Sequence, residues 1–233
     1  DGIVTHTNHL YAQTATCQLG VPVVRAGRNY RCVAEAETWS WQSDSEHLLL
    51  PRPGLQAPAQ LANAATAIAA LRALLPSLPL TADAIAAGVA AARLPARMQV
   101  IPGPVEIVLD VAHNPQATQQ LAAWLRSRPA RGATLAVFAA LADKDVANEV
   151  AALMGQIDIW HLAGLADVGG RSQPVDLLWQ KVGALLARSL ATRHASVAAA
   201  LAEARRTAQP GDRIVVFGSF HTVGEAMAAL DGA

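Results

Sequence analysis

The fold of this chain is decided by the stretch Val105-Glu106-Ile107-Val108-Leu109-Asp110-Val111-Ala112-His113-Asn114-Pro115. Its apolar first half predicts a buried strand over 107–111, and the apolar residues that recur on one helical face after it predict a helix over 116–128. Asp110, His113 and Asn114 would then lie where a parallel strand ends and a helix begins. Open α/β sheets bind ligands at that edge, and the start of a helix offers unpaired N–H groups that suit phosphate.

The same alternation continues to the end of the chain. It predicts an α/β fold whose C-terminal part is a Rossmann-like, mostly parallel sheet with helices on both faces. The further strands are expected at 135–139, 157–162 and 214–217, with a short one near 192–195. The further helices are expected at 145–154, 174–188, 196–208 and 222–230.

The first part of the chain has a different pattern. Short strands separated by turns are predicted at 21–24, 30–34, 37–42 and 47–50, followed by helices at 60–75 and 82–92. Trp39 and Trp41 fall on one face of their strand. The segment 93–97 contains Pro95 and is interpreted as a linker, so the second domain is expected to start near residue 95.

Composition excludes several classes of protein. Hydrophobic residues make up 52% of the chain and charged residues 15%, which indicates a globular protein. The net charge is zero, which argues against an electrostatic nucleic-acid binder. No apolar stretch reaches the roughly 18 residues that a membrane span needs. Two cysteines do not suggest a disulfide scaffold, and we expect a cytoplasmic protein.

Five motifs occur in an order and at a spacing that resemble the folylpolyglutamate synthase/dihydrofolate synthase family of the Mur-ligase superfamily. The resemblance covers roughly residues 17–233. The motifs are Asn63-Ala64-Ala65-Thr66-Ala67, Leu94-Pro95-Ala96-Arg97-Met98-Gln99, Asp110-Val111-Ala112-His113-Asn114-Pro115, Ala142-Asp143-Lys144-Asp145 and Phe217-Gly218-Ser219-Phe220-His221-Thr222-Val223.

The resemblance implies both an organisation and a reaction. Residues 1–94 would be a remnant of the central ATP-binding domain, and residues 95–233 would be the Mur-ligase C-terminal domain. The family uses ATP and Mg²⁺ to activate the carboxylate of dihydropteroate or of a folyl-glutamate as an acyl phosphate, to which L-glutamate is joined as an amide. The resemblance also implies a monomer when full length, with no nucleic-acid or membrane partner.

The P-loop of the family is missing from this sequence. No Gly-x-x-x-x-Gly-Lys-Ser/Thr pattern occurs, and the nearest Gly-rich stretch, 169–172, has neither the lysine nor the length. The magnesium ligands of the family lie upstream of the matched part, so no metal ligand is expected here. We therefore expect the C-terminal portion of a ligase, truncated and inactive alone.

Three residues are ATP-contact candidates through the resemblance. Asp110 would accept the ribose hydroxyls, although an Asp at such a turn also suits a helix N-cap. Arg97 would contact ATP from the linker, since its planar fork stacks on a base or binds phosphate, or it is a plain surface arginine. Asn63 would read the adenine edge with its amide, or it caps or faces solvent at the helix start.

Three more residues are assigned to the reaction. His113 is the catalytic candidate, because an imidazolium can stabilise charge that develops in phosphoryl transfer; the alternative is a histidine satisfied by a backbone carbonyl. Ser219 and Lys144 are candidates for glutamate binding. Ser219 is equally suited to cap the last helix, and a lysine between Asp143 and Asp145 is commonly part of a solvated face.

Other functions stay open at this point. A peptidoglycan-type Mur ligase would share the architecture but usually departs from the Ala-His-Asn-Pro form. A stand-alone nucleotide or amino-acid binding module would bind adenosine nucleotide or glutamate by itself. Half of a split ligase would dock onto a separately encoded P-loop half and co-purify with it.

Overall fold

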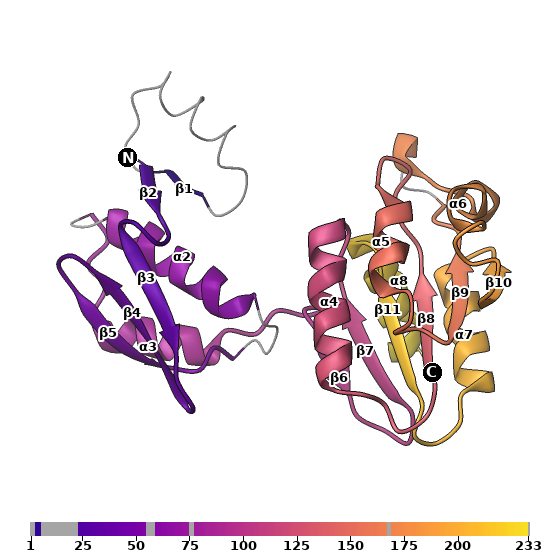
Figure 1. Cartoon of the computed structure of the whole chain (residues 1–233), viewed down its shortest axis with the longest axis horizontal. Coiled ribbons are helices and arrows are strands. Elements are labelled where there is room, and N and C mark those ends of the chain that lie inside the picture. Colours follow the sequence, from indigo (N-terminus) through magenta and orange to yellow (C-terminus); the bar gives the residue numbers. More distant parts are fainter. Residues whose placement is uncertain (1–2, 6–22, 55–58, 75–76, 167–168, 233) are drawn as a thin grey trace. The chain divides into compact units, whose positions relative to one another are not determined.

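The chain folds into two compact units, Asp1–Arg93 and Leu94–Ala233. The structure is a computed structural model, and it describes residues 3–5, 23–54, 59–74, 77–166 and 169–232 (Figure 1). The predicted strand at 21–24 is described only from Val23, and residues 21–22 lie outside the described part. Each unit is considered by itself below.

The first unit packs two helices against a small antiparallel sheet. Strands β3 (Tyr30–Ala34), β4 (Thr38–Ser43) and β5 (His47–Pro51) form the sheet in that order. Helices α2 (Gln60–Ala73) and α3 (Ala82–Ala91) contribute apolar residues to the same core. A two-stranded parallel pair, β1 (Ile3–Thr5) and β2 (Val23–Arg25), precedes them.

Two tryptophans anchor this core, as the alternation along 37–42 predicted. Trp39 and Trp41 are both buried on one face of β4. Each indole N–H finds an acceptor, Trp39 at the carbonyl of Pro51 (2.9 Å) and Trp41 at the carbonyl of Ala65 in α2 (3.1 Å). Buried indoles therefore carry no unpaired donor here, and they tie the sheet to the helix.

The second unit is a six-stranded sheet in the order β10-β9-β8-β11-β7-β6. Five strands are parallel, and β6 (Gln99–Ile101) pairs antiparallel with β7 at one edge. The parallel strands are β7 (Glu106–Asp110), β8 (Thr134–Phe138), β9 (Ile159–Ala163), β10 (Leu190–His194) and β11 (Arg213–Phe217). The predicted mostly parallel sheet is confirmed, including the short strand near 192–195.

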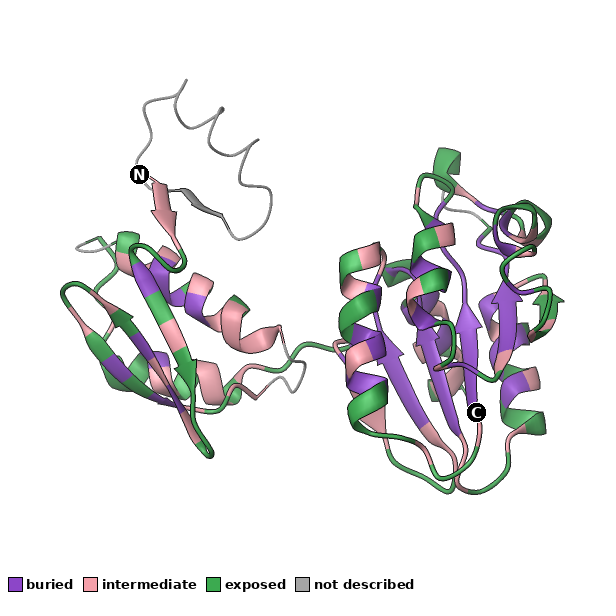
Figure 2. Ribbon diagram, in the orientation of Figure 1, coloured by how far each residue is buried: buried purple, intermediate pink, exposed green. Residues whose placement is uncertain are grey.

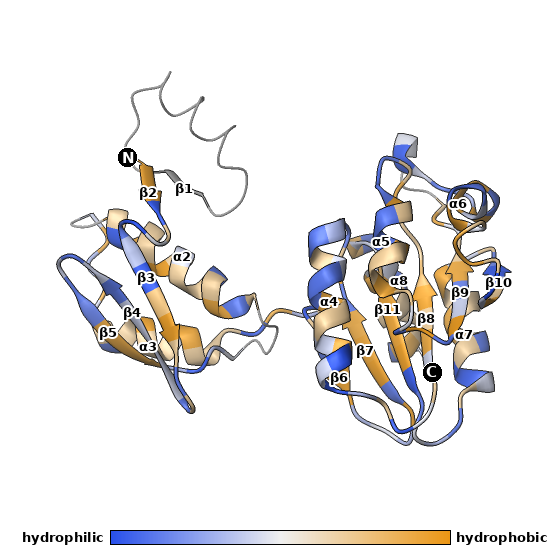
Figure 3. Ribbon diagram, in the orientation of Figure 1, coloured by the Kyte–Doolittle hydropathy of each residue, from blue (hydrophilic) through white to orange (hydrophobic). Residues whose placement is uncertain are grey.

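Helices cover both faces of this sheet (Figure 1). Helices α7 (Val197–Thr207) and α8 (Phe220–Asp231) share one apolar cluster with Leu109, Val137 and Val216 of the strands. The other helices are α4 (Pro115–Ser127), α5 (Val146–Leu153) and α6 (Val175–Val182), with a short 3-10 turn η1 (Gly169–Arg171) before α6. The central strands are buried and apolar over nearly their whole length (Figures 2 and 3), as expected for a sheet covered on both sides.

Strand β6 and helix α6 differ from the prediction. The edge strand β6 was not expected, because three residues carry too little alternation to signal a strand. The helix predicted over 174–188 ends at Val182, where Gly183 lies so close to the Trp179 indole that an added Cβ would be 2.8 Å from it. Among the described residues, no helix combines the length and apolarity that crossing a bilayer demands.

Candidate active site

Asp110 is the organising side chain at the carboxyl end of β7. It is 6% exposed, and its two oxygens accept N–H groups from opposite directions, Oδ2 from Met98 and Oδ1 from Ala112, both at 2.8 Å. Burial raises the pKa of Asp110, while the two N–H donors and the charges of Arg97 and His113 act against that rise. The carboxylate thereby fixes the linker before it and the loop after it.

The linker turn around Arg97 is strained. Ala96 and Met98 have φ values of +59° and +48°, in the left-handed region that residues with a Cβ seldom adopt. Three hydrogen bonds hold the turn: Ala96 N–H to Gln99 Oε1 (2.9 Å), Val111 N–H to the Ala96 carbonyl (2.9 Å) and Met98 N–H to Asp110. Such strain persists only where the surrounding structure holds the backbone in place, and it clusters at functional sites. The surrounding hydrogen bonds therefore hold Arg97 in a defined position.

His113 lies in the loop between β7 and α4. Its Nδ1 is 2.9 Å from the carbonyl of Val111, and because a carbonyl only accepts, Nδ1 carries the proton there. The Nε2 atom is left to accept or, once protonated, to donate to a ligand. The contact with a backbone carbonyl, which was the alternative role for His113, therefore exists. It orients the ring and leaves Nε2 available.

Helix α4 begins immediately after His113. Asn114 is its N-cap, with Oδ1 accepting the Ala117 N–H at 2.9 Å, and Pro115 occupies the first helical position. The alternative in which Asp110 caps this helix is therefore wrong, because Asn114 does so. Asn114 thereby shapes the turn that precedes Pro115.

The turn between β11 and α8 faces the same edge of the sheet. Gly218 has φ +120°, and an added Cβ would lie 2.1 Å from the carbonyl oxygen of Ala139, so only glycine fits. Ser219, 3% exposed, caps α8 by accepting the Thr222 N–H at 3.0 Å, and its hydroxyl lies 2.7 Å from Thr222 Oγ1. Thr222 in turn donates to the Ala139 carbonyl at 2.7 Å. The capping alternative for Ser219 is confirmed, and its hydroxyl is engaged inside the protein.

Phe220, the first residue of α8, was not singled out from the sequence. Its ring is 61% exposed and has two site residues as neighbours: the Arg97 guanidinium carbon lies 5.5 Å from the ring centroid, and the His113 ring centroid lies at 6.1 Å. The signal that was available is its place inside the Gly-Ser-Phe-His-Thr turn. A lone phenylalanine just before an expected helix is otherwise indistinguishable from a core residue.

Lys144 lies in the loop after β8. Its ammonium is 3.8 Å from Asp143, whose carboxylate is also held by Arg171 through two contacts of 3.1 Å. The guanidinium of Arg171 lowers the pKa of Asp143. Asp145 caps α5. Among the described residues, Lys144 makes no hydrogen bond or ion pair with the group formed by Arg97, Asp110, His113 and Phe220.

Asn63 belongs to the first unit, near the start of α2. Its side chain is exposed, and its amide nitrogen donates to Gln60 Oε1 at 3.3 Å. It does not cap the helix, whose N-cap is Ala59. Arg97, Asp110 and His113 therefore lie together in the second unit, whereas Asn63 belongs to the first unit.

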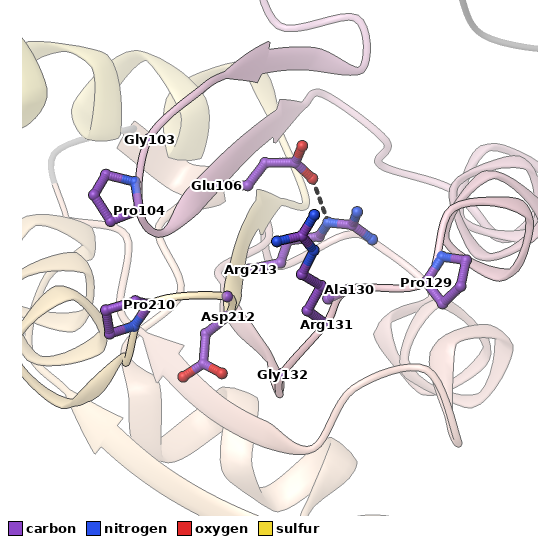
Figure 4. Close-up of a pocket in the computed structure, with 11 residues that line it drawn as sticks. Gly103, Pro104, Glu106, Pro129, Ala130, Arg131, Gly132, Pro210, Asp212 and Arg213 are labelled. Carbon is purple, nitrogen blue, oxygen red and sulfur yellow. Dashed lines mark hydrogen bonds and ion pairs between the residues drawn. The ribbon is translucent and has the colours of Figure 1, made fainter.

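A hollow of about 600 Å³ lies at the opposite, amino edge of the sheet (Figure 4). Glycines and prolines form much of its rim, and three of its charged residues, Glu106, Asp212 and Arg213, are engaged with the protein. Arg213 pairs with Glu106 at 2.6 Å, and Asp212 accepts N–H groups from Ala133 (2.7 Å) and Gln209 (2.8 Å). This hollow is distant in the fold from the strand ends at which open α/β sheets bind ligands.

The comparisons with known proteins decide the family. Residues 96–220 match the model of the family described as Mur ligase, glutamate ligase domain, which is more than half of the chain. This chain belongs to the Mur ligase family. The matched range contains the strained linker turn, the β7–α4 loop and the turn that starts α8.

Individual relatives show which members of the Mur ligase family this chain resembles. Over 214 residues the chain is 35% identical to dihydrofolate synthase/folylpolyglutamate synthase of Escherichia coli, covering 91% of this chain and 47% of that protein. The chain spans about half the length of the curated relatives it matches. The chain is thus homologous to dihydrofolate synthase/folylpolyglutamate synthase.

Solved structures agree with that homology. The structure of E. coli FolC in complex with DHPP and ADP superposes with a TM-score of 0.84 at 31% identity, covering 100% of this chain and 53% of that one. A bifunctional folylpolyglutamate synthase/dihydrofolate synthase with Mn, AMPPNP and L-glutamate bound gives 0.82 at 34% identity, covering 99% and 53%. Both match the fold over essentially all of this chain.

Proposed function

We propose that this chain forms part of an ATP-dependent ligase that joins L-glutamate to dihydropteroate, to a folyl-glutamate, or to both. The observation that carries the proposal is the cluster of Arg97, Asp110 and His113 at the carboxyl edge of a Mur ligase glutamate-ligase domain. The homologous structures that contain ADP with DHPP, or AMPPNP with L-glutamate, support the same substrates here.

In the proposed reaction, the substrate carboxylate attacks the γ-phosphorus of ATP, forming an acyl phosphate and releasing ADP. The amine of glutamate then attacks the acyl carbon, phosphate leaves, and the amine loses a proton to give the amide. The protein contributes mainly by positioning and by stabilising charge. Arg97 and protonated His113 would stabilise the phosphate charge, and the start of α4 adds a positive dipole end.

The remaining assignments are proposals of the same kind. Asp110 and Asn63 would contact the nucleoside, and Lys144 the glutamate. Because the Ser219 hydroxyl is engaged as a cap, we propose that any contribution of Ser219 to glutamate binding is made through the turn it shapes. Mg²⁺ would accompany ATP; the described residues contain no cluster of three or more acidic, His or Cys side chains suited to a metal, so no step is assigned to the ion.

The assay uses the product of the complete reading frame that contains these 233 residues. We expect phosphate release that requires ATP, L-glutamate and a pterin carboxylate together. His113→Ala is expected to lower kcat by about 100-fold, the usual order for one charge-stabilising group. His47→Ala, at an exposed position of β5, is the matched control and is expected to leave kcat unchanged. Ligation that survives His113→Ala at full rate would remove the catalytic assignment.

The finer predictions need separate tests. Assay of the 233-residue chain beside the complete product tests whether the chain is inactive alone, and ligation by the chain would contradict that prediction. Binding without turnover would support a stand-alone module, and co-purification with a P-loop protein would support a split ligase. The cytoplasmic location and the monomeric state also stay predictions.

A further inference from the structure

Phe220 is exposed to solvent, although burying its ring would stabilise the fold. Burying a phenylalanine would stabilise the fold by about 1.5–3 kcal/mol, and the ring is instead 61% exposed at the edge that carries the candidate site. Single exposed apolar residues are common. The feature that sets Phe220 apart is that both of its ring partners are site residues.

Three separate segments meet at this ring. Arg97 comes from the strained linker turn, His113 from the β7–α4 loop, and Phe220 from the start of α8. Asp110 fixes the first two segments through Met98 and Ala112, the residues that adjoin Arg97 and His113. Gly218, Ser219 and Thr222 fix the third segment against the end of β8. The three backbone segments are thus fixed by hydrogen bonds that do not involve the Phe220 ring, and the ring contact joins the side chains.

The ring contact suits both partners chemically. A guanidinium near the face of an aromatic ring is attracted by the ring quadrupole, and an imidazole tilted at 41° to the ring lies within the usual range of aromatic pairs. Arg97 forms no ion pair within the part of the chain that the structure describes, so its charge stays available. A long side chain held in place before binding loses less entropy when the ligand arrives.

We propose that Phe220 is a positioning residue that holds the Arg97 guanidinium and the His113 imidazole together for the nucleotide. The inference rests on the proposed function, because the nucleotide is the ligand that both residues would meet. Phe220 acts through its neighbours and is given no role on the reacting atoms. Its aromatic face, rather than its apolar bulk, is what the role requires.

The test compares Phe220→Leu with Phe220→Tyr in the product of the complete reading frame, with ADP as the titrant. Phe220→Leu is expected to weaken ADP binding about 3- to 5-fold, the size of an exposed cation–π contact, and to leave the melting temperature unchanged. Phe220→Tyr keeps the ring face and is expected to restore binding. Leu177→Ala, an exposed apolar position in the first turn of α6, is the matched control.

Two further readouts separate positioning from other roles. In an Arg97→Ala, His113→Ala background, Phe220→Leu is expected to cause no further loss of affinity, because its effect passes through those side chains. In the absence of nucleotide, the NMR shifts of the Arg97 Nε–H and of the His113 ring protons are expected to move in Phe220→Leu, since the ring current is lost.

The outcomes are distinguishable. Wild-type ADP affinity in Phe220→Leu, an undiminished loss in the Arg97/His113 background, or a Phe220→Tyr variant as weak as Phe220→Leu would each overturn the inference. Unmoved NMR shifts would overturn it as well. A wild-type protein that binds no ADP would instead overturn the proposed function and, with it, the nucleotide part of the inference.

Discussion

Arg213 at the amino edge of the six-stranded sheet and Arg97 at its carboxyl edge are held in opposite ways. At the amino edge, Arg213 has a side chain only 6% exposed, pairs with Glu106 at 2.6 Å, and donates to the Arg128 carbonyl at 2.6 Å. At the carboxyl edge, Arg97 and His113 are held by an aromatic ring and by backbone, with no carboxylate paired to them among the described residues. Charges that satisfy one another stabilise a fold, whereas charges that are oriented and left unpaired are ready for a ligand.

Removing Arg213 at the amino edge is expected to cost the most stability. Arg213→Ala leaves Glu106 without its partner, removes the donor to the Arg128 carbonyl and uncovers the Trp124 ring. We expect a loss of about 3 kcal/mol in the free energy of unfolding, at the low end for buried pairs because Glu106 is partly exposed. Urea denaturation measures it. ADP affinity at a temperature where the variant is folded should not change, and a weaker affinity would contradict the division between the edges.

Asp110→Asn tests the side chain that organises the carboxyl edge. An amide offers one acceptor where the carboxylate offers two, so either the Met98 or the Ala112 N–H would face the NH₂ group. The expected cost is about 2–3 kcal/mol of stability for the buried donor that loses its partner, together with weaker ADP binding because the Arg97 turn relaxes. Denaturation and calorimetry measure the two effects. Unchanged stability with weaker binding would instead favour a purely direct contact to the ribose.

Glu149 offers a pH test on α5. It is 0% exposed with neither carboxylate oxygen hydrogen-bonded, and burial raises its pKa to about 7 despite Lys144 nearby. Because the unfolded chain releases this proton near pH 4.5 and the folded chain only near 7, its ionisation lowers stability as the pH rises through that window. Glu149→Gln should therefore stabilise the protein more at pH 8 than at pH 5, by roughly 2 kcal/mol.

Comparing the variant with wild type at each pH cancels the opposite effect of His161. Burial lowers the pKa of His161 to about 4, so the folded state is destabilised as the pH falls from about 6.5 toward 4. A stabilisation by Glu149→Gln that is equal at both pH values would mean that the carboxylate stays ionised inside the fold.

The smallest effect on the free-energy scale is expected for Arg97→Ala. Stability should change by less than about 0.5 kcal/mol, since Arg97 has no ion pair to lose among the described residues. ADP affinity should fall about 10-fold, or 1.4 kcal/mol. Arg131→Ala at the amino edge is the matched control, an exposed arginine beside the hollow. Equal losses of affinity in the two variants would show that nucleotide binding responds to net charge rather than to this site.

The sequence was informative where a single pattern carried the structure. The apolar runs ending at Asp110 and Phe217 were predictable because a strand buried on both faces is apolar throughout. The paired tryptophans of β4 were predictable because a half-buried strand alternates. The extra length expected for α6 arose from the leucines after Gly183, whereas the helix ends at Val182 with Gly183 as its C-cap. Strand β6 was too short to carry a signal.

The candidate site was less predictable than the fold. Its residues could be proposed from the motifs, but their arrangement depends on the positive φ angles of Ala96 and Met98. A positive φ is predictable from sequence mainly at glycine, and neither residue is a glycine. The role of Asp110 as acceptor of two N–H groups follows from contacts twelve and two residues away. The ring contacts of Phe220 join segments more than a hundred residues apart in the sequence.

Nucleotide is expected to bind at the carboxyl edge, around the strained turn and the β7–α4 loop. An ADP titration followed by amide NMR, on the product of the complete reading frame with Mg²⁺ present, tests it most directly. We expect shifts for the N–H groups of Met98, Ala112 and Phe220, with those of Gly132 and Gly211 at the amino edge unmoved. Shifts confined to Gly132 and Gly211, or no shifts at saturating ADP, would contradict it.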